Sequence, residues 1–306
     1  MKIIMKIHLL TNILVLFNCT EMRNIMNTTS MIQPLLKLCG LKTINETFIQ
    51  SPVTIYMYEA ALSESQLPDN SGNSDNSDSL SLSFIPSPYN EWIIGFNDND
   101  DSSDFYCIGA VTRLTSISLK KHDHYIGLRF NDTACYYNKG VSNSTPPKEM
   151  LNKVFVYEPS KESCEYNLVN AFKKAGAFNV KADLIREFLS KEKTLCPIPY
   201  GTYNIMDMIK GSNGNINIST AAEKSGYSPR HIHRLFINSL GFSPKDYCRY
   251  IRFQKVVSDI LKDPMRNNSE FIMNIGYSDQ AHFQREFKAF TGITPRQFIS
   301  YHQKNL

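Results

Sequence analysis

A repeat in the last third of the chain is the feature that most constrains its fold. The two copies are GYSPRHIHRLFINSLGFSPKDY (Gly226–Tyr247) and GYSDQAHFQREFKAFTGITPRQF (Gly276–Phe298). Both begin with Gly-Tyr-Ser and a helical stretch, and both end with glycine, an apolar residue, Ser or Thr, proline and then an aromatic residue. Their period is about 50 residues, and two copies are too few for a solenoid. The repeat therefore predicts two copies of one supersecondary unit.

The spacing within the first copy predicts a helix-turn-helix. Gly226 can take the positive φ of a tight turn between two helices without steric cost. Ser228 can cap the second helix, and Pro229 suits its first position, where the missing N–H costs nothing. One stripe of that helix is apolar and is expected to be buried: Ile232, Leu235, Phe236 and Leu240.

The side chains off the apolar stripes are candidates for reading DNA. In the first copy they are Arg230, His233 and Arg234. In the second copy we expect Ser278 to cap the helix and Phe283, Phe287 and Phe290 to be buried. The outward residues there are Gln280, Gln284, Arg285 and Lys288. Arg and Gln can make paired hydrogen bonds to guanine and adenine edges in the major groove.

A single helix is predicted between the copies, over Pro244–Lys262. At about 1.5 Å per residue it reaches roughly 28 Å, close to the ~34 Å between successive major-groove faces on one side of B-DNA. Its basic residues, Arg252 among them, are candidates for phosphate contact. Residues 201–306 carry 14 Lys+Arg and 8 Asp+Glu, a net charge of +6, so the first 200 residues carry −2 of the total +4. This asymmetry favours an anionic partner for the last third, nucleic acid before membrane.

The segment from about Ile205 to Gln303 resembles the DNA-binding domain of the AraC/XylS family of bacterial transcription regulators. The resemblance rests on ISTAAEKSGYSPRHIHRLF, on Gly-Phe-Ser-Pro with RFQK in the linker helix, and on GYSDQAHF with REFK. It implies that Arg230, His233 and Arg234 face bases from the first recognition helix, and Gln280, Gln284 and Arg285 from the second. One departure is Ile272, four residues before Gly276, where the family usually has a small residue. We expect it to push its helix outward or to require smaller neighbours such as Ala281.

The first part of the chain is expected to be β-rich. Strands are predicted at Val53–Tyr58, Trp92–Phe96, Tyr106–Val111 and Tyr125–Phe130, a mobile loop at Pro68–Ser83, and helices at Tyr166–Lys174 and Ala182–Leu189. The expected fold is therefore α+β. We predict an N-terminal extension at 1–40, a β-rich effector or dimerisation domain at 41–195, and a double helix-turn-helix DNA-binding domain at 196–306. Phe105–Tyr137 resembles a strand-rich segment of the sensor domains in one branch of the family.

The remaining patterns indicate little further chemistry. The seven cysteines are scattered without a C-x-x-C pair, which is typical of reduced cytosolic thiols. His231 and His233 lie on different faces of a helix, and no site is assigned at His122 and His124, so no metal and no cofactor is expected. We predict a cytoplasmic, non-enzymatic regulator that binds promoter DNA, with activation favoured over repression. RNA polymerase, a small-molecule effector and a second copy of the chain are candidate partners, and no membrane partner is expected. The alternative is a DNA-repair or other enzyme that carries the same type of DNA-binding domain.

Overall fold

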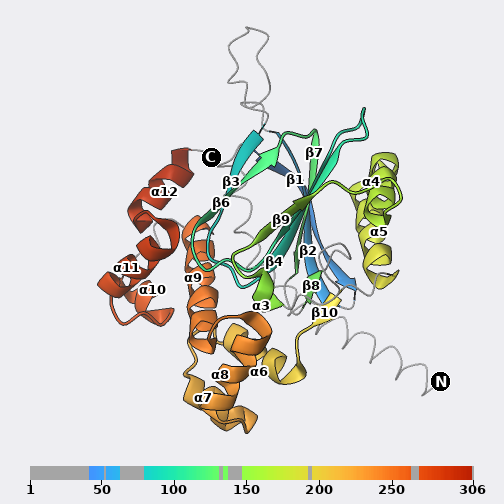
Figure 1. The fold of residues 1–306 in the computed structure, drawn as a ribbon. Helices are drawn as coiled ribbons and strands as arrows, with labels where there is room; N and C mark the ends of the chain where they lie inside the picture. The colour runs from blue at the N-terminus through green and yellow to red at the C-terminus, as the bar shows by residue number, and fades with distance from the viewer. Residues whose placement is uncertain are drawn as a thin grey trace, which may run out of the picture.

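The computed structural model describes residues 41–51, 53–62, 79–130, 134–136, 147–191, 195–262 and 269–304. Strands dominate up to residue 157 and helices dominate from residue 164 onward. Figure 1 shows one pair of helices at the right of the sheet and the last helices of the chain at its left. The predicted α+β class is confirmed, and the predicted extension at 1–40 lies outside the described residues.

The main sheet has six antiparallel strands in the order β1-β2-β7-β4-β5-β9. Their bounds are β1 (Leu41–Ser51), β2 (Val53–Leu62), β4 (Asn90–Phe96), β5 (Ser103–Ile108), β7 (His124–Phe130) and β9 (Val154–Tyr157). Two smaller antiparallel sheets pair β3 (Ser79–Phe84) with β6 (Thr115–Lys120) and β8 (Ala134–Tyr136) with β10 (Leu195–Pro197).

Three of the predicted strands lie within β2, β4 and β7. The fourth, Tyr106–Val111, overlaps β5 only at residues 106–108, because β5 runs from Ser103 to Ile108. The prediction of a loop over Pro68–Ser83 is wrong for its last five residues. Ser79–Ser83 belong to β3, where Leu80 and Leu82 are buried and the serines between them alternate with these leucines. This two-residue period is the signature of a strand, and the high serine content obscured it.

Both faces of the main sheet are covered. On one face lie the helices α4 (Cys164–Ala175) and α5 (Phe178–Lys191), which match the two predicted helices and pack against Trp92, Phe96 and Phe105. On the other face the β3–β6 pair packs against Tyr56, Tyr58 and Ile93. Neighbouring residues of β4 therefore point into two different cores, as the alternation of a strand requires.

The helical half begins at α6 (Tyr200–Gly211) and continues with α7 (Ile218–Ser225), α8 (Pro229–Leu240), α9 (Pro244–Lys262), α10 (Ser269–Asn274), α11 (Gln280–Thr291) and α12 (Pro295–Lys304). The predicted linker helix is confirmed with the same bounds as α9. Strand β10 crosses residue 196, where we placed the domain boundary, and the helical half starts three residues after it ends. The domain limits themselves stay a prediction.

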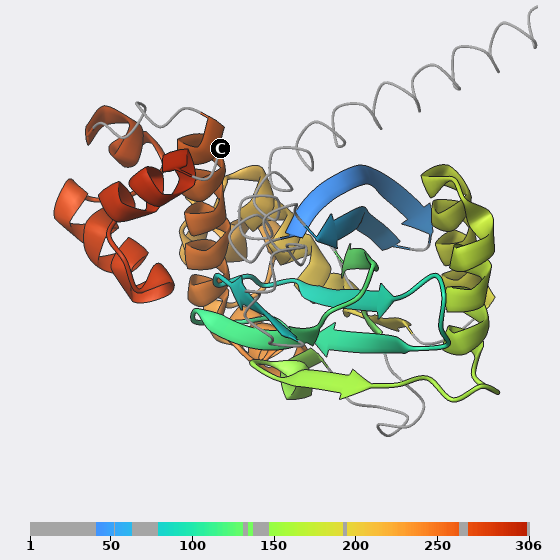
Figure 2. The ribbon, with the colours of Figure 1, turned by 90° about the horizontal axis from the view of Figure 1, so that it is seen from above.

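The two halves share one hydrophobic cluster. The core of the helical half is built on α9, with Tyr247, Phe253 and Val256 fully buried. The same cluster contains Ile85, Tyr89 and Ala110 from the sheet half, and the short helix α3 (Pro147–Met150) lies against α8. Figure 2 shows the helical half seated against one end of the sheet, opposite α4 and α5. Among the described residues, no helix combines the length and apolar character that crossing a membrane requires.

Candidate nucleic-acid interface

The first helix-turn-helix unit is formed by α7 and α8. Asn217 caps α7, and Gly226 ends it with a φ of 74° while its N–H donates to Ala222 O at 3.0 Å. The Ser228 hydroxyl accepts from His231 N at 3.2 Å, and Pro229 is the first residue of α8. The predicted turn and cap are confirmed, and the physical reason is that each residue supplies the φ or the hydrogen bond that the turn requires.

Helix α8 has a buried face and an exposed face. Ile232, Phe236 and Leu240 are buried as predicted, whereas Leu235 is only partly buried. Arg230, His233 and Arg234 are all exposed. Arg234 Nη2 lies 3.0 Å from His231 Nδ1, a contact that orients the guanidinium along the outer face. The three predicted side chains are thus on the surface of one helix, available to an external partner.

The second unit, α10 and α11, departs from the prediction at its cap. Ser278 was expected to cap α11, but the Asp279 carboxylate accepts from His282 N at 2.7 Å and occupies the cap position. The prediction was wrong because the second copy has an extra residue and lacks the proline that starts α8, so its helix begins one residue later relative to the glycine. The hydrogen bonds to His282 N and Ser278 hold the pKa of Asp279 below its usual value.

This displacement changes which residues of the two recognition helices correspond. Counting from the first helical residue, Pro229 matches Gln280 and the buried Ile232 and Phe236 match Phe283 and Phe287. His233 then corresponds to Gln284, and Arg234 corresponds to Arg285. The other predicted residues have partners of different character, since Arg230 corresponds to Ala281 and Lys288 to Ile237.

All four predicted residues of α11 are exposed: Gln280, Gln284, Arg285 and Lys288. Arg285 Nε donates to Ala281 O of its own helix at 3.2 Å. Ile272 is fully buried, and α10 ends at Asn274, two residues before Gly276, whereas α7 continues up to the residue before Gly226. Ala281 is exposed and does not compensate for Ile272, contrary to our expectation; the earlier end of α10 relative to its glycine is the difference that accompanies the larger side chain.

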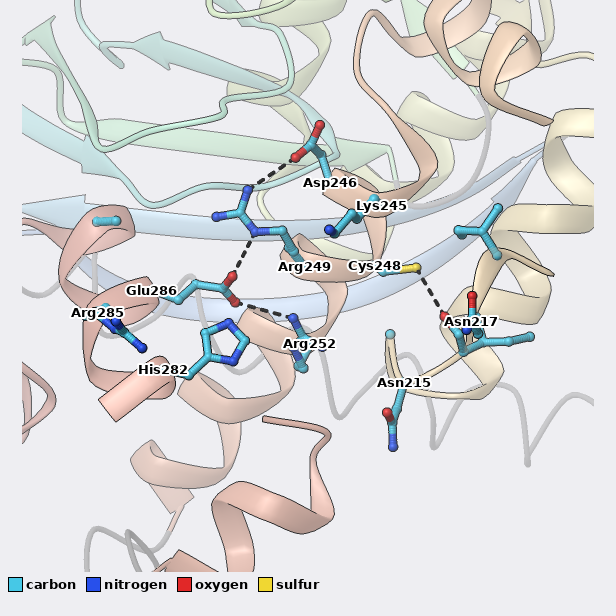
Figure 3. Close-up of a pocket in the computed structure, with 14 residues that line it drawn as sticks. Asn215, Asn217, Lys245, Asp246, Cys248, Arg249, Arg252, His282, Arg285 and Glu286 are labelled. Carbon is cyan, nitrogen blue, oxygen red and sulfur yellow. Dashed lines mark hydrogen bonds and ion pairs between the residues drawn. The ribbon is translucent and has the colours of Figure 1, made fainter. Parts of the chain in front are cut away.

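Glu286 is a central residue of this region that the sequence analysis missed. It lies on the inner side of α11, 5% exposed, and accepts hydrogen bonds from Tyr277 Oη at 3.0 Å and Arg249 Nε at 2.7 Å. Arg252 Nη2 lies 3.7 Å from Oε1, the same oxygen that accepts from Tyr277. Figure 3 shows the carboxylate between the two guanidinium groups of α9. Burial first, and then the neighbouring Glu286, raises the pKa of the Tyr277 hydroxyl well above its usual value.

Arg252 is held inside this network rather than presented on the surface. Its side chain is 14% exposed, Nη1 donates to Gly276 O at 3.2 Å, and the guanidinium lies 4.6 Å from the centre of the Tyr277 ring. These contacts attach the linker helix to the turn of the second unit. A phosphate contact by Arg252 stays a prediction, and the structure adds this positioning role.

An open groove runs between the two units and joins the interface. Its walls are the α6–α7 loop at Gly214–Ile218, the first turns of α9 and the inner side of α11 (Figure 3). The groove carries the cationic side chains Lys245, Arg249, Arg252 and Arg285 and the acidic side chains Asp246 and Glu286. Cations exceed carboxylates by two in this set, so the groove favours an anionic occupant. No group of three or more His, Cys, Asp or Glu side chains suited to a metal ion occurs within the described part of the chain.

Comparison with known proteins supports the assignment of this region as a DNA-binding domain. A helix-turn-helix domain model matches residues 221–300. A protein of Proteus vulgaris named as a probable transcription factor, PqrA, is 34% identical over 86 residues, which cover 28% of this chain and 70% of PqrA. The Msm operon regulatory protein of Streptococcus mutans serotype c is 25% identical over 91 residues, covering 30% of this chain and 32% of that protein.

Among solved structures, ToxT from Vibrio cholerae O395 is similar with a TM-score of 0.41 and 10% identity, over 86% of this chain and 98% of ToxT. For the two relatives named above, the matched segment spans most of the length of PqrA and about a third of the length of the Msm regulator. The motifs of the two repeat copies, the helix-turn-helix match and the similarity to PqrA agree: the chain belongs to the AraC/XylS family of DNA-binding transcription regulators.

Proposed function

We propose that this protein recognises a specific promoter sequence by placing α8 and α11 in successive major grooves of duplex DNA. The observation that carries the proposal is the pair of matching exposed positions, His233 with Gln284 and Arg234 with Arg285, on two helices with the same buried stripe. Arg and Gln at these positions can read guanine and adenine edges.

The groove between the units is the proposed seat of the DNA backbone between the two major grooves. Lys245 is exposed there, and Arg249 keeps about a third of its side chain exposed although it is paired with Glu286. Phosphate neutralisation by such side chains contributes affinity without sequence preference. Arg230, Gln280 and Lys288 stand at the edges of the two recognition helices and are proposed to contact bases or the adjoining backbone.

For the sheet half we propose sensing of a small-molecule effector and dimerisation, without enzymatic activity. Arg129 supports an anionic effector: it is 6% exposed, its Nε pairs with Glu91, and its Nη1 has no hydrogen-bond partner among the described residues. Its guanidinium and Nζ of Lys210 in α6 lie 5.7 and 6.0 Å from the centre of the Tyr89 ring, and burial lowers the pKa of Lys210 to about 7. Control of transcription in the cytoplasm through RNA polymerase, with activation favoured, completes the proposal.

The test is selection of binding sites from random duplex DNA with the full chain, followed by gel-shift titration at physiological salt. We expect a selected site with two parts and an affinity about 10³-fold or more above that for shuffled DNA. Arg234→Ala and Arg285→Ala should each remove about 1–3 kcal/mol of base discrimination, each in a different part of the site.

The matched control is Arg296→Ala, which removes an exposed arginine from α12 outside both recognition helices and should leave base preference unchanged. Equal affinity of the wild-type chain for selected and shuffled DNA would contradict sequence-specific regulation.

A further inference from the structure

Three segments of the sheet half form one surface that faces the helical half. They are residues 85–90, 109–114 and 147–153, here called the bracing surface. The first two are joined by a pair of backbone hydrogen bonds between Ser87 and Val111, at 2.8 and 2.9 Å. The second and third are joined by Gly109 N, which donates to Lys153 O at 3.0 Å. Backbone hydrogen bonds therefore join the three segments to one another.

Asn152 is the residue that locks the bracing surface. Its backbone has a φ of 57°, its N–H donates to Ala110 O at 2.8 Å, and its Oδ1 accepts from Thr112 N at 2.8 Å and from Thr112 Oγ1 at 3.1 Å. A non-glycine residue rarely adopts this conformation, and asparagine is one of the few that tolerate it. Three hydrogen bonds therefore hold Asn152 in a backbone conformation that is unfavourable by itself, and so fix the local geometry.

The bracing surface contacts the end of the first recognition helix. Gly241 is the C-cap of α8, and a Cβ built there would lie 3.1 Å from Lys148 Cα and 3.2 Å from Leu151 Cδ2. Glycine at this position both permits the left-handed φ of 83° and lets the backbone of α3 approach closely. The carboxyl end of α8 is thus seated directly on the sheet half.

The same surface comes close to the matching end of the second recognition helix. Gly292 is the C-cap of α11, and a Cβ there would lie 3.8 Å from Leu114 Cδ2. Between the two caps, Gln254 of α9 is 1% exposed and its Nε2 lies 3.5 Å from Pro86 O. The bracing surface thus packs closely against the cap of α8, approaches the cap of α11 through Leu114, and contacts the linker helix at Gln254.

We infer that the bracing surface sets the distance and angle between α8 and α11, and so determines which spacing of the two DNA half-sites the protein accepts. This inference rests on the proposed function. Asn152 and Leu114 act as positioning residues: neither lies on the exposed faces of the recognition helices, and both control where those faces sit. The sheet half thereby contributes to DNA specificity through geometry, without touching DNA.

The experiment compares gel-shift affinities for the site selected by the full chain and for the same site with one base pair inserted between its two parts. One base pair shifts the second half-site by about 3.4 Å and rotates it by about 35°. For the wild-type chain the insertion should lower affinity about tenfold or more, as one mismatched base pair does. For Leu114→Ala and Asn152→Ala the loss should shrink to about threefold or less, with base preference within each half-site unchanged.

Asn152→Asp keeps the acceptor for Thr112 and should restore the wild-type penalty. Val156→Ala, an exposed apolar truncation on β9 at 52% exposure, is the matched control for Leu114 at 43% and should keep it as well. Amide hydrogen exchange over residues 287–296 should quicken in Leu114→Ala, which reports release of the α11 end without DNA. Because Leu114 is substantially exposed, its truncation leaves the core intact even if Asn152→Ala does not fold.

An unchanged tenfold penalty in Leu114→Ala, whether or not exchange quickens, would overturn the inference. A relaxed penalty accompanied by altered base preference would overturn it too, because the recognition helices themselves would then be disturbed. Absence of any selected site with the wild-type chain is the distinct outcome that removes the proposed function together with this inference.

Discussion

At the scale of single residues, two buried glutamates, Glu286 and Glu59, hold cationic side chains in place. Glu286 collects Arg249, Arg252 and the Tyr277 hydroxyl, and so attaches α11 to the linker helix. The residue was overlooked because arginine and glutamate on a basic helix suggest surface contacts. The available signal was an acid beside Phe283 and Phe287 on an otherwise apolar inner face. A buried carboxylate needs such partners, since an unpaired one carries a large desolvation cost.

Glu59 makes a corresponding pair in the sheet half and leads to a pH prediction. Its carboxylate pairs with Lys181 of α5, both side chains being 8% exposed. Burial alone would raise the pKa of Glu59, but the hydrogen bonds from Lys181 and Asn45 outweigh burial, and the pKa lies below its usual value of 4.5. The folded state therefore binds this proton more weakly than the unfolded state. The stability contribution of Glu59 is complete above pH 4.5 and is lost as pH falls through the lowered pKa.

The expected outcome for Glu59→Gln is a loss of about 3–5 kcal/mol in the free energy of unfolding near pH 7, because Lys181 is left buried without its partner. The dependence on pH below 4.5 should also flatten. Urea unfolding between pH 3 and pH 7 measures both effects. Glu158→Gln, whose side chain is 70% exposed, is the control and should change little. A Glu59→Gln variant that loses stability toward pH 3 as steeply as wild type would contradict this account.

At the scale of elements, the second helix-turn-helix unit shows how one extra residue changes a helix start. Helix α8 starts with a Ser-Pro pair directly after the turn, whereas α11 starts after Ser278 and Asp279. The cap moves to Asp279, and with it the correspondence between the two recognition helices moves by one position. Similar repeats therefore do not align simply by their shared Gly-Tyr-Ser.

Substitution of Asp279 should separate the two candidate caps. Asp279→Ala should lower the thermal unfolding midpoint by a few degrees and speed amide exchange in the first turn of α11, since the His282 N–H loses its acceptor. Ser278→Ala should have the smaller effect, because in the described part of the chain the Ser278 hydroxyl hydrogen-bonds to the side chains of Asp279 and His282 and not to a backbone N–H. Equal effects of the two substitutions, or a larger one for Ser278→Ala, would contradict the assignment of Asp279 as the cap.

At the scale of the whole molecule, the shared hydrophobic cluster couples the two halves. Ile85, Tyr89 and Ala110 belong to the sheet half by sequence but pack with α6, α8 and α9. Tyr89 is 8% exposed, and burial raises the pKa of its hydroxyl to about 12. The helical half therefore depends for its stability on side chains of the sheet half, far earlier in the chain.

Truncation of Tyr89 tests this coupling. Tyr89→Ala should cost about 3–5 kcal/mol, as for other large aromatic side chains removed from a core. Amide exchange should rise in α6 and α9 and not only around β4. Tyr89→Phe keeps the ring and should stay close to wild type. If Tyr89→Ala weakens protection only within the sheet half, the two halves are not coupled through this residue.

Local patterns in the sequence were sufficient for the first helix-turn-helix unit and for the linker helix. The Gly226 turn, the Ser228–Pro229 helix start, the buried stripe of α8 and the full length of α9 depend on interactions between residues a few positions apart. The chemistry of those interactions is visible in any window of the chain. The family and the exposed faces that carry Arg234 and Arg285 followed from the same patterns.

Tertiary structure alone decided the rest. The serines of β3 suggested a loop, and its pairing with β6 is visible only in the structure. The hydrogen bonds and ion pairs of Glu286 likewise depend on contact between α9 and α11. The bracing surface joins residues 85–90, 109–114 and 147–153, and no pattern within one segment reveals contact with another. Structure can be predicted from local sequence where the hydrogen bonds join residues a few positions apart. Contacts between distant segments depend on how the whole chain packs.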